Sequence, residues 1–223
     1  MTTTLITGAN KGIGFETARQ LIAAGHTVYI GSRDATRGAK AAADLGAHFV
    51  QLDVTDDASV AAAMASIDHL DVLINNAGIA LLALNGPEAL SVFDTNAVGI
   101  IRVTEAALPL LRRSANPVVV NVSSALGSFW AVTNPDRPAF HVAAIVYGAS
   151  KSAVSMLTLQ YSKAVPEIKF NAVEPGYTAT DLGGQNHGGR PVEISARVVA
   201  RMASIGPDGP TGTFQEDDTE LGW

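Results

Sequence analysis

The chain has 223 residues, of which 47% are hydrophobic, and it contains no cysteine. Its formal net charge is −6 at pH 7. A chain of this length and apolar content can bury the core of an α/β domain. The absence of cysteine excludes disulfides and thiolate metal sites and favours a reducing, cytoplasmic location. An acidic charge without a cluster of Lys or Arg argues against nucleic acid as a partner.

Neither membrane insertion nor secretion is expected from the sequence. No apolar run reaches the roughly 18 residues that a spanning helix needs. The segment Met1–Leu5 lacks the basic and apolar regions of a signal peptide. The acidic segment Glu216–Glu220 is expected to be a solvated end rather than a docking motif.

Short apolar runs alternate with alanine-rich stretches along most of the chain. The expected strands are Thr3–Thr7, Thr27–Ile30, His48–Gln51, Val72–Asn75, Val118–Val122 and Lys169–Val173. The expected helices are Gly14–Ala24, Ala35–Leu45, Ala58–Ile67, Pro87–Leu111 and Ala149–Ala164. This alternation predicts βαβ units in one α/β domain over residues 1–223, a doubly wound parallel sheet with helices on both faces.

Two segments interrupt the alternation, and both follow strands. Gly127–Val146 is rich in turn residues, and Gly183–Pro191 is rich in glycine and small polar residues. Both are therefore expected at the carboxyl edge of the sheet, where open α/β sheets bind ligands. We expect Gly183–Pro191 to be mobile and to close over a bound substrate, although a passive connector to a helix starting near Pro191 is the simpler alternative.

A glycine-rich turn follows the first expected strand and opens the first helix. It runs from Thr7 to Gly14, with glycines at 8, 12 and 14. Glycines at such a turn allow the backbone to approach a pyrophosphate at the helix N-terminus. The turn predicts a dinucleotide site that includes Gly8, Asn10, Lys11, Gly12, Ile13 and Gly14.

The end of the second strand indicates which dinucleotide binds. An acidic residue there would bind the ribose 2′-hydroxyl of NAD, whereas a cation accommodates the 2′-phosphate of NADP. This chain has Arg33 at that point, Lys11 inside the glycine turn and Arg37 one turn later. Asp34 is interpreted as the N-cap of the next helix. We expect NADPH, the alternative being that these cations are only solvated.

Two further strand ends are candidates for nucleotide contacts. Asp53, next to Val54, is placed to accept a hydrogen bond from an adenine amino group, although it is also typical of a turn aspartate. In the run from Asn75 to Gly78, the small residues Ala77 and Gly78 leave room for a ribose. The asparagine amides of this run can stabilise the turn and the neighbouring strands.

Tyr147 and Lys151 stand four residues apart in an expected helix. Residues at this spacing share one helix face. The Lys151 ammonium is expected to favour the phenolate of Tyr147 and to lower a pKa that starts at about 10. Such a tyrosine exchanges a proton with a substrate oxygen near neutral pH. Beside a dinucleotide, this pair indicates hydride transfer to a carbonyl.

Together these residues resemble the short-chain dehydrogenase/reductase family. The ordered matches are the glycine turn Thr7–Gly14, the run Asn75–Gly78, Asn96, Ser124, Tyr147 with Lys151, and Pro175-Gly176. They cover nearly the whole chain and imply a single Rossmann fold. The stretches Gly8–Gly14, Ser32–Gly38 and Gly209–Phe214 are most similar to the NADPH-dependent carbonyl reductases of that family.

The resemblance implies a catalytic tetrad of Asn96, Ser124, Tyr147 and Lys151. Tyr147 would protonate the carbonyl oxygen, and Ser124 would hydrogen-bond the same oxygen. Lys151 would hold the nicotinamide ribose, and Asn96 would position a water that relays protons to Lys151. Ser123 is the alternative to Ser124. The resemblance also places Pro175, Gly176, Thr178 and Thr180 at the nicotinamide and phosphates.

The sequence leaves the assembly open. The gap between Ser124 and Tyr147 is longer than in the plainest family members and shorter than in monomeric mammalian-type carbonyl reductases. Either a monomer or a homo-oligomer is compatible with this gap. His141 and His187 have no partner at ligand spacing, so no metal is expected.

The sequence favours an NADPH-dependent oxidoreductase that reduces ketones or aldehydes to alcohols. The expected pocket is apolar, lined by Leu126, Phe129, Trp130 and Tyr177. The alternatives are a short-chain dehydrogenase that oxidises a secondary alcohol and a non-catalytic NADPH sensor. Extended relatives that act as epimerases or dehydratases are disfavoured, because too few residues follow Pro175 for a substrate domain.

Overall fold

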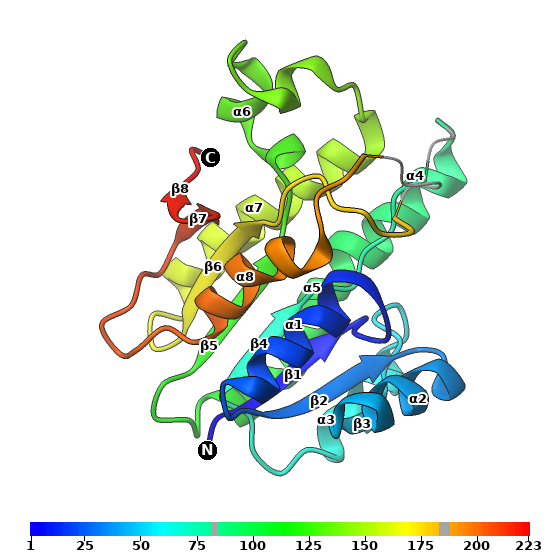
Figure 1. The fold of residues 1–223 in the computed structure, drawn as a ribbon, viewed down its shortest axis with the longest axis vertical. Coiled ribbons are helices and arrows are strands. Elements are labelled where there is room, and N and C mark those ends of the chain that lie inside the picture. The colour runs from blue at the N-terminus through cyan, green and yellow to red at the C-terminus, as the bar shows by residue number, and fades with distance from the viewer. Residues whose placement is uncertain (82–83, 183–187) are drawn as a thin grey trace.

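The computed structural model describes residues 1–81, 84–182 and 188–223 and contains one eight-stranded sheet in the order β3-β2-β1-β4-β5-β6-β7-β8 (Figure 1). The strands are β1 (Thr3–Thr7), β2 (Thr27–Ser32), β3 (His48–Gln51), β4 (Val72–Asn75), β5 (Val118–Val122), β6 (Lys169–Glu174), β7 (Thr213–Glu216) and β8 (Thr219–Glu220). Neighbouring strands pair in parallel, except β7 with β8. The chain reverses its winding direction between β1 and β4, which is where open α/β sheets bind nucleotides.

Helices cover both faces of the sheet. They are α1 (Gly12–Ala23), α2 (Ala35–Leu45), α3 (Asp57–Ala65), α4 (Gly86–Phe93), α5 (Gly99–Leu111), α6 (Phe129–Thr133), α7 (Ile145–Ala164) and α8 (Val192–Ala203). Successive strand residues point to opposite faces. In β1, Leu5 packs into the core beneath α3 and α5, whereas Ile6 packs into the core beneath α1, α2 and α8. The expected fold class, a doubly wound Rossmann sheet, is confirmed.

The C-terminal part of the sheet departs from expectation. The acidic segment Glu216–Glu220 is not simply a solvated end, because its residues belong to β7, β8 and the turn between them. Glu216 pairs with Arg137, and Asp217 pairs with Arg190 at 2.9 Å. These two ion pairs tie the hairpin to segments that follow β5 and β6.

The expected helix Pro87–Leu111 is interrupted in its middle. Residues Asp94–Val98 form a π-helical turn between α4 and α5. The buried Asn96 lies in this turn. Because π turns hold one extra residue, they redirect a side chain and occur often at functional sites.

The turn-rich segment between β5 and α7 is more ordered than the sequence indicated. It contains α6 and two short 3-10 turns, Ala125–Gly127 and Pro138–His141. It stands beyond the carboxyl ends of the strands, at the top of Figure 1. Helix α7 begins at Ile145, earlier than expected, so Tyr147 lies in its first turn. Helix α8 begins at Val192, as expected from Pro191.

The expectation of a mobile lid at Gly183–Pro191 falls mostly on residues 183–187, which lie outside the described residues. Within the described ranges, none of the helices has both the length and the hydropathy that crossing a bilayer requires.

Candidate active site

The glycine turn between β1 and α1 depends on glycine at each of its three positions. Gly8 and Gly12 have φ angles of +64° and +60°, in the left-handed region. A Cβ atom at Gly14 would lie 2.5 Å from Nδ2 of Asn76. That amide donates to the carbonyl oxygens of Thr7, at 2.8 Å, and Gly8, at 3.2 Å. The turn is therefore held open and close to the end of β4.

The first turn of α1 offers backbone donors to a ligand. Asp34, Asp56 and Asn85 cap the N-termini of α2, α3 and α4 through their side chains. At α1, no side chain among the described residues does so. Uncapped N–H groups at a glycine-lined helix start are suited to a pyrophosphate. Asn10 and Ile13 are partly buried members of the same turn.

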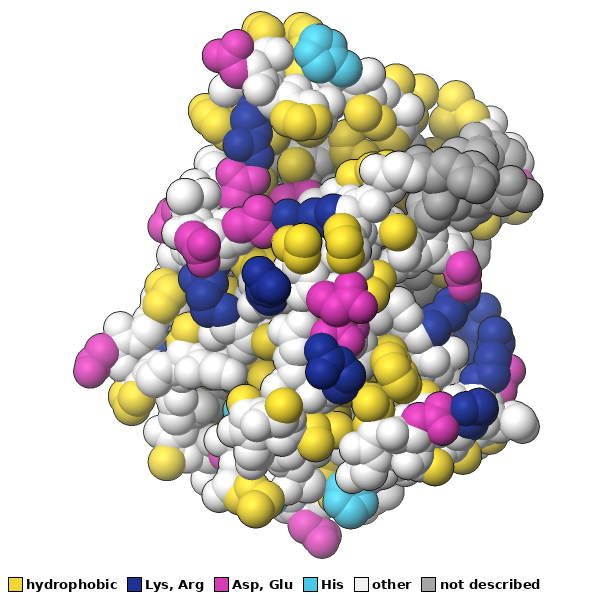
Figure 2. Space-filling model, in the orientation of Figure 1, with side chains coloured by type: hydrophobic (Ala, Val, Ile, Leu, Met, Phe, Trp, Pro, Cys, Tyr) yellow, Lys and Arg dark blue, Asp and Glu magenta, His cyan; other side chains and the backbone are white. Residues whose placement is uncertain are grey.

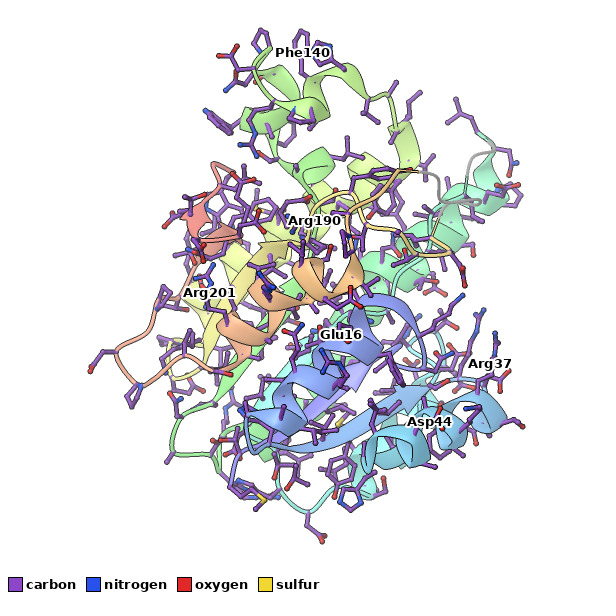
Figure 3. All side chains as sticks on the ribbon, in the orientation of Figure 1. Glu16, Arg37, Asp44, Phe140, Arg190 and Arg201 are labelled. Atoms are coloured by element: carbon purple, nitrogen blue, oxygen red, sulfur yellow. The ribbon has the colours of Figure 1, made fainter. Side chains whose placement is uncertain are left out.

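The three candidate cations differ in their partners. Lys11 forms an exposed ion pair with Asp181 at 2.8 Å. Arg37 pairs with Asp34 at 2.8 Å, and Asp34 also caps α2 as expected. Arg33 is exposed and forms no ion pair within the described part of the chain. Exposed pairs contribute little energy, so a phosphate can displace them. Figure 3 shows Arg37 at the edge of α2.

The two candidates after β3, Asp53 and Val54, are held by local contacts. Asp53 accepts hydrogen bonds from the backbone and hydroxyl of Thr55 through Oδ1, which is the turn-aspartate arrangement. Burial opposes the charge of Asp53, but these bonds, with smaller contributions from nearby cations, lower its pKa. Val54 is buried and packs against Gly99. The turn after β3 is thus held by local hydrogen bonds and by packing on α5.

Asn75 does not present its side chain to a nucleotide. It is buried and donates to Thr104 at 3.1 Å and to Asn121 at 2.8 Å. The amide crosslinks β4, β5 and α5, as expected of the asparagine amides in this run. Ala77 and Gly78 follow at the carboxyl edge of the sheet. Ala77 packs closely against Gly8, because a Cβ atom built at Gly8 would lie 3.0 Å from Ala77 Cα.

Tyr147, Ser124 and Lys151 converge at the carboxyl end of β5. The Ser124 hydroxyl accepts from the Leu126 backbone N–H at 3.3 Å and lies near enough to the Tyr147 phenol to lower its pKa. The Lys151 Nζ atom lies 5.6 Å from the Tyr147 ring centroid and donates to the Val122 carbonyl oxygen at 2.7 Å. Helix α7 thus presents both side chains on one face, as the spacing predicted.

The pKa of Tyr147 shifts in the direction opposite to our expectation. Burial of the phenol raises its pKa, the negative charge of Glu174 raises it further, and the nearby Ser124 hydroxyl lowers it. Burial lowers the pKa of Lys151 to about 8, against an opposing contribution from Glu174. The sequence did not show how deeply both groups are buried, and desolvation disfavours the charged form of each.

Asn96 reaches the same site from the π turn. Its side-chain oxygen accepts from Ile79 N–H at 2.8 Å, and its amide donates to the Ile79 carbonyl at 2.9 Å and to Ser150 Oγ at 3.0 Å. A Cβ atom at Gly78 would lie 3.4 Å from Asn96 and 3.6 Å from Lys151 Nζ. Asn96 and Lys151 therefore meet over Gly78.

The two neighbouring serines have different surroundings. Ser123 is buried, and its hydroxyl contacts the Lys151 carbonyl oxygen at 3.1 Å and Ser155 Oγ at 3.0 Å. Ser124 is partly exposed at the start of the Ala125–Gly127 turn. This placement favours Ser124 as the hydroxyl that meets a substrate.

The turn after β6 faces the glycine turn. Gly176 has a φ of +76° and its carbonyl accepts from the Thr178 hydroxyl at 2.7 Å. Thr180 Cγ2 lies 3.4 Å from a Cβ built at Gly12. The predicted nicotinamide residues and the glycine turn thus come together across the carboxyl edge.

Sequence reasoning missed two charged residues at this turn. Arg190 Nε donates to the Pro175 carbonyl at 2.8 Å, and the Arg190 backbone pairs with Tyr177 and Ala179. Glu174 accepts from the backbone of Gly176 at 2.8 Å. The sequence did contain a signal for Glu174, because it is the one charged residue in the strand segment Phe170–Glu174. Arg190 gave none, because it follows a glycine-rich segment.

Two cavities adjoin the Ala125–Gly127 turn, and the four expected pocket residues do not share one. The larger, about 420 Å³, is lined by Leu126, Phe129, Val132, Val142, Ala144, Ile145, Gly148, Ala149 and Ser152. The smaller, about 230 Å³, is lined by Ala125, Arg137, Pro138, Ala139, Glu174, Gly176, Tyr177, Arg190, Glu216 and Asp217. Trp130 lines neither, because its ring packs on Gly222 beneath Arg137. Acidic and basic side chains gather around the smaller cavity, between α6 and α8 in Figure 2.

A glycine turn at the switch point of a doubly wound sheet, facing a Tyr-Lys pair, defines a dinucleotide-dependent oxidoreductase. Residues 2–189 match the sequence profile of the short chain dehydrogenases. The chain belongs to this family.

Relatives with known names support the assignment over almost the full length. The chain is 32% identical to (−)-isopiperitenone reductase of Mentha piperita, with 97% of this chain and 96% of that protein covered. It is 28% identical to salutaridine reductase of Papaver bracteatum, with 95% and 93% covered. The structure of NADPH-bound carbonyl reductase from chicken fatty liver is similar, with a TM-score of 0.87, 28% identity, and 100% and 99% covered.

Proposed function

We propose that this chain is an NADPH-dependent oxidoreductase that reduces ketones or aldehydes to alcohols. The observation that carries the proposal is the Tyr147 phenol, which lies near the Ser124 hydroxyl with Lys151 Nζ 5.6 Å from its ring centroid, at the carboxyl edge of β5. NADPH, when bound, supplies a hydride. The names of similar proteins, among them reductases and an NADPH-bound carbonyl reductase, support the same reaction class.

The residues of this chain would handle the substrate oxygen and its proton. Because its pKa is raised, Tyr147 is protonated at neutral pH and is a donor to the carbonyl oxygen. The Ser124 hydroxyl stabilises the negative charge that develops on that oxygen. Lys151, held between Val122 and Asn96, carries a positive charge below about pH 8 and binds a ribose hydroxyl.

The cofactor site fits a dinucleotide with a 2′-phosphate. The uncapped start of α1 and the three obligatory glycines suit the pyrophosphate. Arg33, exposed beyond the end of β2, is the cation that would take the 2′-phosphate, with Lys11 and Arg37 nearby. Thr178 and the Pro175-Gly176 turn would hold the nicotinamide carboxamide.

Replacing Arg33 with Ala is expected to lower the ratio of kcat/KM for NADPH to that for NADH by tenfold or more. The reason is the loss of a charge-assisted bond to phosphate, worth about 1.5–3 kcal/mol. Steady-state kinetics with both cofactors measure the ratio. Lys40→Ala, which removes another exposed cation of α2, serves as the control and should leave the ratio unchanged. An unchanged ratio in Arg33→Ala would move the phosphate contact elsewhere.

The rate of carbonyl reduction is expected to fall on the alkaline side with an apparent pKa near 8. Lys151 loses its charge through about pH 8, because its burial lowers its pKa to that value, whereas Tyr147 keeps its proton. The apparent value belongs to the coupled pair. A profile of kcat/KM from pH 6 to about pH 10 tests this. Lys163→Gln, on the exposed end of α7, should leave the profile unchanged, and a flat profile would contradict the role of Lys151.

The larger cavity suggests the substrate class. Its lining is mostly apolar, and it borders the catalytic pair because Leu126 and Gly148 lie close to Ser124 and Tyr147 in the chain. We propose apolar ketones and aldehydes of medium size. A panel of carbonyl compounds, assayed by NADPH consumption, tests the function. NADPH binding without turnover of any carbonyl or alcohol would instead indicate a sensor protein.

A further inference from the structure

Glu174 ends β6 and places a partly buried carboxylate between two loops of the site. Its Oε1 accepts from the backbone N–H of Gly176 at 2.8 Å, and its Oε2 accepts from the backbone N–H of Ala125. These two donors, Ala125 and Gly176, are 51 residues apart in the sequence. One side chain thus joins the end of β5 to the turn after β6.

Both donors adjoin residues that act in the proposed reaction. Ala125 directly follows Ser124, whose hydroxyl lies near the Tyr147 phenol. Gly176 begins the turn that carries Thr178, and its left-handed φ of +76° fixes the direction of that turn. Because carboxylate bonds to backbone N–H groups are short and strong, Glu174 sets the separation between these two turns.

The titratable groups around Glu174 come from α7, from β7 and from the segment that precedes α8. The negative charge of Glu174 raises the pKa of both Tyr147 and Lys151 on α7. Glu216 on β7 and Arg190, which precedes α8, act on Glu174 itself, and burial raises the pKa of its carboxyl. Glu216 is paired with Arg137 and Arg190 with Asp217, so their charges are partly satisfied. Figure 3 shows Arg190 beside the start of α8.

We propose that Glu174 is a positioning residue, whose carboxylate fastens the Ser124–Ala125 turn to the Pro175–Gly176 turn and directs a negative charge at the Tyr147–Lys151 pair. The inference rests on the proposed reductase function. Arg190 also fixes this turn, since its Nε donates to the Pro175 carbonyl oxygen. Its guanidinium packs directly on Gly176, where a Cβ atom would lie 2.5 Å from Arg190 Nε.

Two variants separate the hydrogen bonds from the charge. Glu174→Gln keeps the side-chain volume and removes the charge, and it turns an NH₂ group toward one of the two backbone donors. Glu174→Asp keeps the charge and shortens the side chain, so that it cannot reach both donors. Glu220→Gln removes an exposed carboxylate from β8 and is the matched control. Thermal unfolding of each variant establishes that it is folded.

Amide hydrogen exchange of the protein without cofactor is the first measurement. In Glu174→Gln and Glu174→Asp, exchange at Ala125 or Gly176 is expected to be faster by roughly tenfold or more, the effect of losing a bond to a charged acceptor. Glu220→Gln should exchange as the wild type does. Unchanged protection at both amides in Glu174→Gln would overturn the positioning role.

The pH profile of kcat/KM is the second measurement, and a purely structural role would not move it. The anion at Glu174 raises the pKa of Lys151, so its removal in Glu174→Gln should move the alkaline limb to lower pH by about half a unit or more. Glu174→Asp should keep the wild-type limb. If the wild type is active and its kcat/KM falls at the same alkaline pH as that of Glu174→Gln, the inference is overturned but the reductase function stands. A wild type that reduces no carbonyl would overturn both.

Discussion

Tyr147→Phe is expected to lower kcat for carbonyl reduction by roughly 10²- to 10⁴-fold, the usual contribution of a positioned acid. Phenylalanine keeps the ring that packs near Lys151 and removes only the hydroxyl beside Ser124. NADPH binding should stay close to the wild-type value, since the glycine turn and Arg33 are untouched. Turnover assays and cofactor titration by fluorescence measure the two effects separately.

The neighbouring serines provide the matched comparison for this result. Ser124→Ala should lower kcat by roughly 10²- to 10³-fold, as loss of one oxyanion donor does. Ser123→Ala should affect kcat far less, because its hydroxyl contacts the Lys151 carbonyl and Ser155 inside the protein. If Ser123→Ala gave the larger loss, the oxyanion role would belong to Ser123. If Tyr147→Phe kept wild-type turnover, the proton donor would be another group.

Gly127→Ala is expected to impair both stability and turnover. A Cβ atom there would lie 2.4 Å from the backbone carbon and 2.6 Å from the carbonyl oxygen of Lys151. Backbone cannot rotate away as a flexible side chain can, so α7 must shift at the catalytic lysine. Overpacking of this kind costs about 1–3 kcal/mol in the free energy of unfolding, and kcat should fall together with it.

Urea unfolding and kcat of the same variant check this expectation. Gly206→Ala is the control, because nothing lies within 4 Å of a Cβ built at Gly206, and it should change the free energy of unfolding by no more than about 0.5 kcal/mol. Wild-type stability and turnover in Gly127→Ala would show that α7 tolerates the displacement.

Strands such as β4 and β5 were predictable because their residues are buried throughout and read as nearly continuous apolar runs. Strand β3, at the sheet edge, is buried only at Val50. Strand β7 was missed, since Phe214 is its one large apolar residue and its neighbours are polar. The order of motifs was enough to bring Ser124, Tyr147 and Lys151 together. Long-range packing decided what was missed: the burial that raises the pKa of Tyr147 and the packing of Trp130 on Gly222.

The π turn at Asp94–Val98 links the position of Asn96 in the site to the rotation of α4 relative to α5. One residue of an α-helix corresponds to a rotation of about 100° about the axis. Loss of a single residue from this turn would restore a regular helix, and it would rotate α4 by that angle relative to α5. Either Asn96 would leave Ile79 and Ser150, or α4 would turn Val92 out of its buried position. Insertions and deletions are therefore tolerated less here than substitutions, although the stretch lies on the outside of the sheet.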